Sequence, residues 1–189
     1  MTLSLMSLSR CRIVMGAVML GVGLHCAAQE APAQPEHIDY WSVWADAKGV
    51  THQSLCHWND MTLETFAPPA RPEWVSHNNP QPKQMIFNVA PVGWVGDWHR
   101  NPAQQWVVTL DGRWFVETSD GVRREYTPGE VMLGIDQGAR PINGHEGHLA
   151  GTIGDVPVRI MVVQLAPSTL KQPDAPCAAG GQIIKGARP

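Results

Sequence analysis

The sequence is poor in phenylalanine and tyrosine and lacks several motifs that mark common enzyme classes. It has three phenylalanines and two tyrosines against eight tryptophans. It contains no glycine-rich phosphate loop, no nucleophile elbow and no CxxC pair, which argues against P-loop nucleotide binding, α/β-hydrolase chemistry and thioredoxin-like exchange. It also has no basic run interleaved with aromatic residues, and 17 acidic residues outnumber 14 basic ones. We therefore expect no nucleic-acid partner.

The N-terminal apolar run is too short to cross a membrane. Residues Ile13 to Leu24 carry no charge, but a bilayer core requires about 20 apolar residues. Arg10 and Arg12 precede this run, and Cys26-Ala27-Ala28 follows it with the small residues that signal peptidase reads. We predict that residues 1–28 are a cleaved signal peptide. The mature chain is then periplasmic or secreted and carries no membrane anchor.

Cysteine is scarce, and cleavage would leave only two of the four residues. Cys11 and Cys26 lie in the predicted signal peptide, whereas Cys56 and Cys177 stay in the mature chain. A single pair of cysteines in an oxidising compartment usually forms a disulfide. We predict a disulfide between Cys56 and Cys177.

The mature sequence divides into an irregular first part and a second part rich in strand patterns. Residues 29–82 contain many prolines and predict a leader and an arm packed on the domain, with one strand at 40–44 and one helical turn at 59–66. Residues 83–166 alternate short apolar segments with turn residues such as Asp111-Gly112, a strong hairpin signal. This pattern predicts an all-β sandwich or barrel. Residues 167–189 are expected to form a tail.

The second part resembles the cupin superfamily, specifically its small single-domain bacterial members. The first cupin motif has two histidines two residues apart, then a glutamate and a glycine. The matching positions here are His99, Asn101, Gln105 and Gly112. The turn that opens the second motif matches Pro128-Gly129-Glu130-Val131, and the histidine of that motif appears later, in Gly147-His148.

This resemblance implies an all-β cupin fold, a double-stranded β-helix or jelly-roll barrel, with an irregular N-terminal arm. It covers about residues 83–166. Cupins include dioxygenases, isomerases, epimerases, decarboxylases, sugar binders and storage proteins, so the fold alone does not identify the activity. Cupins also often pair, which leaves a homodimer open.

The candidate pocket residues follow from strand alternation, because residues 99, 101, 103 and 105 share one face of an extended chain. We expect His99, Asn101 and Gln105 to converge in the barrel if the chain bends at Pro102, and His148 to join them from a neighbouring strand. His145 is a weaker candidate, since it lies three positions from His148 and would point to the opposite face of a strand. Trp98, Trp106 and Arg140 are further candidates for contacts with a substrate.

The metal and metal-free interpretations of this pocket both stay open. His99, Gln105 and His148 would supply two imidazoles and a weak amide oxygen to a divalent iron, zinc, copper or nickel ion. Alternatively, the two histidines line a polar pocket and bond to Gln105 and Asn101, and His99 acts as a general base. The nearby Asp136 and Glu146 are expected to be solvated loop charges.

Two functions from different classes follow. The first is an exported enzyme that acts on a small molecule in the barrel pocket, as a metal-dependent dioxygenase or an isomerase. The second is a non-catalytic periplasmic module that binds a carbohydrate or another small ligand, since tryptophans cluster around the first motif and two of its usual ligands are replaced.

Overall fold

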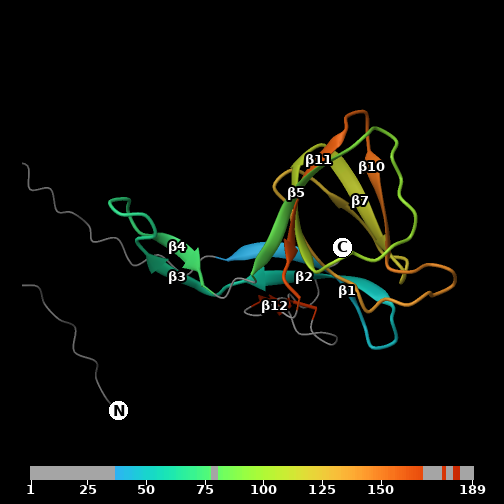
Figure 1. Cartoon of the computed structure of the whole chain (residues 1–189), viewed down its shortest axis with the longest axis horizontal. Helices are drawn as coiled ribbons and strands as arrows, with labels where there is room; N and C mark the ends of the chain where they lie inside the picture. The colour runs from blue at the N-terminus through green and yellow to red at the C-terminus, as the bar shows by residue number, and fades with distance from the viewer. Residues whose placement is uncertain (1–36, 78–80, 168–175, 178–180, 184–189) are drawn as a thin grey trace, which may run out of the picture. The chain divides into compact units, whose positions relative to one another are not determined.

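A computed structural model describes residues 37–77, 81–167, 176–177 and 181–183. These residues form an all-β structure with no helix (Figure 1). No helix long and apolar enough to cross a membrane therefore occurs in the described part of the chain. The twelve strands are β1 (Ile38–Ala45), β2 (Thr51–Trp58), β3 (Met61–Glu64), β4 (Glu73–Ser76), β5 (Pro82–Ala90), β6 (Gln105–Asp111), β7 (Arg113–Thr118), β8 (Arg123–Tyr126), β9 (Val131–Ile135), β10 (His148–Ile153), β11 (Val158–Leu165) and β12 (Gly181–Ile183).

The strands assemble into three sheets within one compact unit, Gln34–Pro189. The largest has seven strands in the order β12-β2-β1-β9-β6-β11-β5. Its β1 and β9 strands are parallel, and its other neighbours are antiparallel. A second sheet has the order β10-β7-β8, and β3 with β4 forms a separate hairpin. Both antiparallel and parallel pairs therefore occur, and the described strands form open sheets rather than one closed barrel.

The main core lies between the seven-stranded and three-stranded sheets. Each strand alternates its side chains between two faces, and both sheets send one apolar set inward. The buried cluster takes Trp41 from β1, Val107 from β6 and Val162 from β11, and it takes Val116 from β7 and Tyr126 from β8. Apolar side chains of both sheets thus exclude water from the same space, which holds the two layers together.

The opposite face of the seven-stranded sheet carries a second buried cluster around Tyr40, Trp58 and Leu133. Cys56 belongs to this cluster and forms a disulfide with Cys177, with a Cα–Cα distance of 5.8 Å. The predicted disulfide is confirmed, and it fits an oxidising, exported location. The predicted signal peptide, residues 1–28, lies outside the described residues.

The sequence patterns located most strands of residues 83–166 to within a few residues. The short apolar segments of this region, which we expect to be strands, correspond to β5, β6, β7, β8, β9 and β11; their bounds in the sequence are 85–89, 106–110, 114–118, 122–126, 131–135 and 156–165. The all-β class is confirmed. The double-stranded β-helix of the cupins stays a prediction.

Two expectations for the N-terminal part were wrong. The helical turn expected at 59–66 is instead strand β3, which pairs with β4. The expected irregular arm contains β1 and β2, which belong to the seven-stranded sheet itself. Eight residues of β1 pair with eight residues of β2, and the side chains of Tyr40 and Val43 are buried. These tertiary contacts outweigh the weak local sequence signals of this segment.

Candidate functional site

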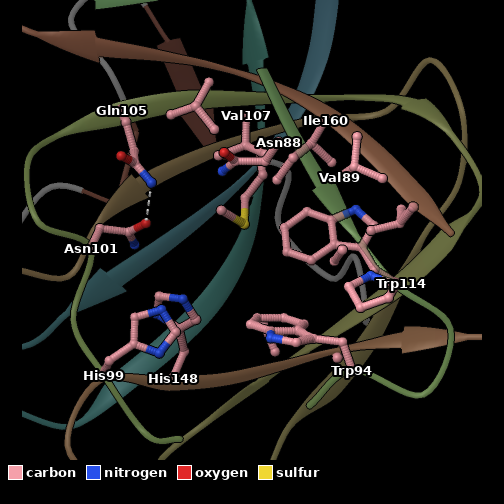
Figure 2. A pocket seen from close by; sticks show the side chains of 17 residues that line it. Asn88, Val89, Trp94, His99, Asn101, Gln105, Val107, Trp114, His148 and Ile160 are labelled. Carbon is pink, nitrogen blue, oxygen red and sulfur yellow. Dashed lines mark hydrogen bonds between the residues drawn. The ribbon is translucent and has the colours of Figure 1, made fainter. Parts of the chain in front are cut away.

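A cavity of about 340 Å³ opens between the two larger sheets. Its walls come from β5, β6, β7, β9, β10 and β11 and from the segment between β5 and β6. Figure 2 shows polar groups on one side of the cavity and indole rings on the other. The residues that line it are Asn88, Val89, Ala90, Pro91, Trp94, His99, Asn101, Gln105, Val107, Trp114, Met132, His148, Ala150, Gly151, Val158, Ile160 and Val162.

His99 and His148 face each other across a short backbone pairing. The amide of each donates to the carbonyl oxygen of the other, at 3.0 and 2.9 Å. Their ring centroids lie 4.6 Å apart, side by side in the cavity (Figure 2). The predicted convergence of these two histidines is therefore observed. His99 is exposed, whereas His148 is buried.

Asp136 lies behind His148 and is fully buried. Its Oδ2 accepts a hydrogen bond from His148 Nδ1 at 2.7 Å. Its Oδ1 accepts from the amide nitrogen and the side-chain Nδ2 of Asn101, at 2.9 and 2.7 Å. Burial acts to raise the pKa of Asp136, but the hydrogen bonds and charge of His148 and the bonds from Asn101 outweigh it and lower the pKa. The group is thus held as a carboxylate.

The remaining polar side chains continue this network away from the histidines. Gln105 Nε2 donates to Asn101 Oδ1 at 2.7 Å, and Gln164 Nε2 donates to Gln105 Oε1 at 3.2 Å (Figure 2 shows the first bond). Gly134 makes room for Asn101, because a Cβ atom at 134 would lie 2.5 Å from the Asn101 side chain. The amides of Asn101 and Gln105 are therefore committed to neighbouring protein groups.

The hydrogen bonds at the two Nδ1 atoms determine which ring nitrogens remain for a ligand. His148 Nδ1 bonds the Asp136 carboxylate, and His99 Nδ1 lies 2.7 Å from the carbonyl oxygen of Asp97. A carbonyl and a carboxylate accept, so each Nδ1 carries the proton of the neutral ring. The Nε2 atoms of both rings are then proton acceptors available to a bound molecule.

Indole rings form much of the apolar wall. Trp94 is 40% exposed and lines the cavity from the segment after β5. Trp114 is buried on β7, and its Nε1 donates to Thr109 Oγ1 at 2.9 Å. Among the described residues, those that line the cavity include no lysine, arginine, aspartate or glutamate. The wall therefore suits a neutral molecule with an apolar or ring-shaped face.

The structure brings four predicted residues together and places four others elsewhere. His99, Asn101, Gln105 and His148 all line the cavity. Trp98 and His145 stack on each other outside it, with ring centroids 4.1 Å apart. Trp106 packs against Tyr40 on the opposite face of the large sheet, and the Arg140 amide bonds to Gly49. The proposed roles of these last four in the cavity thus have no geometric support.

The expectation that Asp136 is a solvated loop charge was wrong, since its side chain is completely buried. Its position directly after the apolar segment 131–135 is the signal in the sequence that could have indicated burial. Glu146, by contrast, forms an exposed ion pair with Arg100 at 3.1 Å. Trp94, Trp114 and Asn88 were also missed as specific cavity residues. Their place in the wall depends on strand pairings that no local motif encodes.

The cavity contains few strong ligands for the predicted metal ion. His99 and His148 offer two imidazoles, but Gln105 Oε1 already accepts from Gln164 and the Asp136 oxygens are occupied by His148 and Asn101. Among the described residues, no group of three His, Cys, Asp or Glu donors within reach of one ion includes either histidine. Transition-metal sites with open positions generally use three strong ligands. The cavity therefore offers two strong metal ligands, and the metal ion expected there stays a prediction.

Comparisons with known proteins leave the family open. No family model matches the chain, and no curated protein matches it. Among solved structures it is similar to the crystal structure of protein NMB1881 from Neisseria meningitidis, with a TM-score of 0.34 and 14% identity. That match covers 47% of this chain and 84% of the other. A likeness at this level carries no argument about function, and membership of the cupin superfamily stays a prediction.

Proposed function

We propose that this protein is an exported enzyme of the cupin type that moves protons on a small neutral molecule in the cavity between its sheets. One observation carries the proposal: the buried Asp136 carboxylate accepts from His148 Nδ1 at 2.7 Å, while His99 lies beside the same ring. A carboxylate behind an imidazole fixes its tautomer and stabilises its protonated form. His148 Nε2 is thereby prepared to take a proton from a ligand.

The reaction type that fits this pair is an isomerisation or epimerisation next to a carbonyl group. His148 Nε2 removes a proton from the carbon beside the carbonyl, and the electron pair of that C–H bond moves into an enolate. The resulting imidazolium is paired with the Asp136 carboxylate. A proton then returns to the same carbon or to its neighbour from one of the two histidines. No electron donor or acceptor is required.

The exposure of the two rings favours different roles for them. The buried His148 holds its proton next to the substrate, whereas the exposed His99 exchanges protons with water. Trp94 offers an exposed ring face on which a sugar-like or planar molecule could stack. Because no lysine or arginine occurs among the described residues of the cavity wall, the wall favours a neutral substrate over a phosphorylated one.

Proton exchange in heavy water tests the proposal. A panel of neutral hydroxy-ketones and aldoses is incubated with the full chain in D2O, and proton NMR follows loss of the C–H signal beside the carbonyl. We expect exchange with at least one of them, and a loss of at least a hundredfold in His99→Ala and His148→Gln. His145→Ala, whose ring stacks on Trp98 outside the cavity, is the matched control and should exchange normally.

The second candidate is a binding module without catalysis, and the commitment of the Asn101 and Gln105 amides to each other favours it. Tryptophan fluorescence measured on the same panel separates the two functions, because Trp94 and Trp114 line the cavity. Saturable binding without exchange would replace the enzyme by the binding module. Neither binding nor exchange across the panel would overturn both.

A further inference from the structure

We propose that His37, Asp39 and His57 form a binding site for a divalent transition-metal ion, separate from the cavity. One ligand atom from each of these three residues lies within 4.8 Å of the others. Among the described residues, no other group of three His, Cys, Asp or Glu donors comes this close together. The proposal does not depend on the reaction proposed for His148.

Backbone geometry brings the three side chains together. His37 directly precedes β1, and Asp39 is the second residue of that strand, so two positions separate them, the spacing at which side chains of an extended chain share one side. Asp39 and His57 are direct cross-strand partners in the β1–β2 pairing. Side chains directly opposite each other on antiparallel strands have Cβ atoms about 5 Å apart. Strand register therefore holds Asp39 and His57 together, and His37 joins them from the position directly before β1.

The distances suit an ion that binds nitrogen and oxygen ligands. His37 Nε2 lies 3.4 Å from Asp39 Oδ1, and the two imidazole centroids are 4.5 Å apart at an interplanar angle of 81°. Ligands at about 2.0–2.1 Å from a tetrahedral zinc ion are themselves about 3.3–3.4 Å apart. In this structure His57 Nδ1 forms a hydrogen bond with Asp39 Oδ1. A small rotation of these partly exposed side chains would admit an ion between them.

The donor chemistry selects the class of ion. Two imidazoles and one carboxylate favour zinc, copper or nickel over magnesium or calcium, which prefer oxygen ligands alone. The side chains of His37, Asp39 and His57 are 50%, 52% and 31% exposed, so water can complete the coordination.

Two other histidines also lie beside carboxylates, but neither of them has the three converging donors of the His37–Asp39–His57 group. His52 is bonded to Asp120 through Nδ1 and approaches Asp46 through Nε2, so its two carboxylates lie on opposite edges of the ring and cannot share an ion. His77 pairs with Glu64 at 3.3 Å but no second imidazole joins them. His77 is 53% exposed, which makes it a matched control for an exposed histidine beside a carboxylate.

Zinc titration of the full chain, purified without a histidine tag, tests the site. Isothermal calorimetry with ZnCl2 should find one site per chain whose dissociation constant rises at least tenfold in His37→Ala and in His57→Gln. His77→Ala should bind as the wild type does. Cobalt replacing zinc should give the visible absorption of a nitrogen–oxygen site, and His57→Gln should lose it.

The alternative location for the metal is addressed by His99→Ala, which removes an exposed imidazole from the cavity. Unchanged zinc binding in this variant supports the surface site, and loss of the titrated site would overturn it in favour of the cavity. Equal weakening by His77→Ala would also overturn it, since binding would then be an ordinary property of exposed histidines. Circular dichroism of each variant should match the wild type. Should His57→Gln unfold, His37→Ala, which precedes β1, decides the matter.

Discussion

A Cβ atom at position 147 would lie 2.2 Å from the carbonyl oxygen of His99. Gly147 also has a φ of +82°, a conformation that L side chains adopt rarely. Immediately after it, the amide of His148 donates to that same carbonyl. The glycine thus allows strand β10 to begin directly against His99, which places both imidazoles in one cavity.

We expect Gly147→Ala to separate the two histidines and destabilise the protein strongly. The added methyl group meets backbone atoms of His99 and Arg100, which cannot rotate away. Gly144→Ala is the control, because Gly144 has a similar φ of +86° but no atom within 4 Å of the added carbon. It should cost only the conformational penalty of about 1–2 kcal/mol. Urea denaturation of both variants measures the difference, and equal losses would contradict the steric argument.

Asp136→Asn should reduce the free energy of unfolding by about 3–5 kcal/mol, in the range seen when one partner of a buried pair is removed. The asparagine amide nitrogen cannot accept from His148 or Asn101, so at least one buried donor loses its partner. Asp155→Asn, on an exposed turn, is the control and should change little. A loss below about 1 kcal/mol in Asp136→Asn would show that the buried network contributes little to stability.

The same carboxylate should make the protein sensitive to acid. The pKa of Asp136 is lowered in the folded state from an ordinary value of 3.8. The folded state therefore binds this proton less readily than the unfolded state does. The resulting stabilisation is complete above pH 3.8 and is lost as the pH falls through the lower folded pKa. Urea midpoints measured from pH 6 to pH 2 should fall more steeply in the wild type than in Asp136→Asn.

His52 should give a pH dependence of the opposite sign. The hydrogen bond to Asp120 raises the pKa of His52 above 6.5; partial burial opposes the rise, and the charges of Asp120 and Asp46 add to it. The stabilisation is complete below pH 6.5 and is lost as the pH rises through the folded pKa. NMR titration of the His52 ring should give a midpoint above 6.5. A midpoint at or below 6.5 would contradict the ion pair with Asp120.

Reduction of the Cys56–Cys177 disulfide should destabilise the fold by about 4–5 kcal/mol if chain entropy dominates, because 121 residues separate the two cysteines. Urea denaturation with and without dithiothreitol measures this directly. The double variant Cys56→Ser with Cys177→Ser should show the same loss and no further response to dithiothreitol. An unchanged midpoint on complete reduction would mean that packing alone holds Cys177 against the sheet.

Local sequence signals were sufficient to predict a strand or a bond where the pattern of a segment agrees with its surroundings in the fold. Asp111-Gly112 marked the boundary between β6 and β7, where Gly112 adopts a φ of +77°. The hairpin expected at this turn was wrong, because β6 and β7 belong to different sheets and do not pair with each other. The pairing of Cys56 with Cys177 was predictable because the other two cysteines lie in the predicted signal peptide, which leaves one possible partner for each. Strand β3 was not predictable, since its four residues gain their strand form by pairing with residues of β4 that lie about 9 to 15 positions along the chain.

The sequence alone determined the all-β class, most strands of residues 83–166, the disulfide and the pairing of His99 with His148. The first three follow from side-chain period, turn residues and the scarcity of cysteine, whereas the pairing of His99 with His148 was implied by the resemblance to the cupin motifs. Only the tertiary structure decided that Asp136 is a buried partner of His148, that Trp106 faces away from the cavity, and that His37 meets His57. Each of these depends on strand register and sheet order, because a side chain's environment is fixed by the distant strands placed beside it.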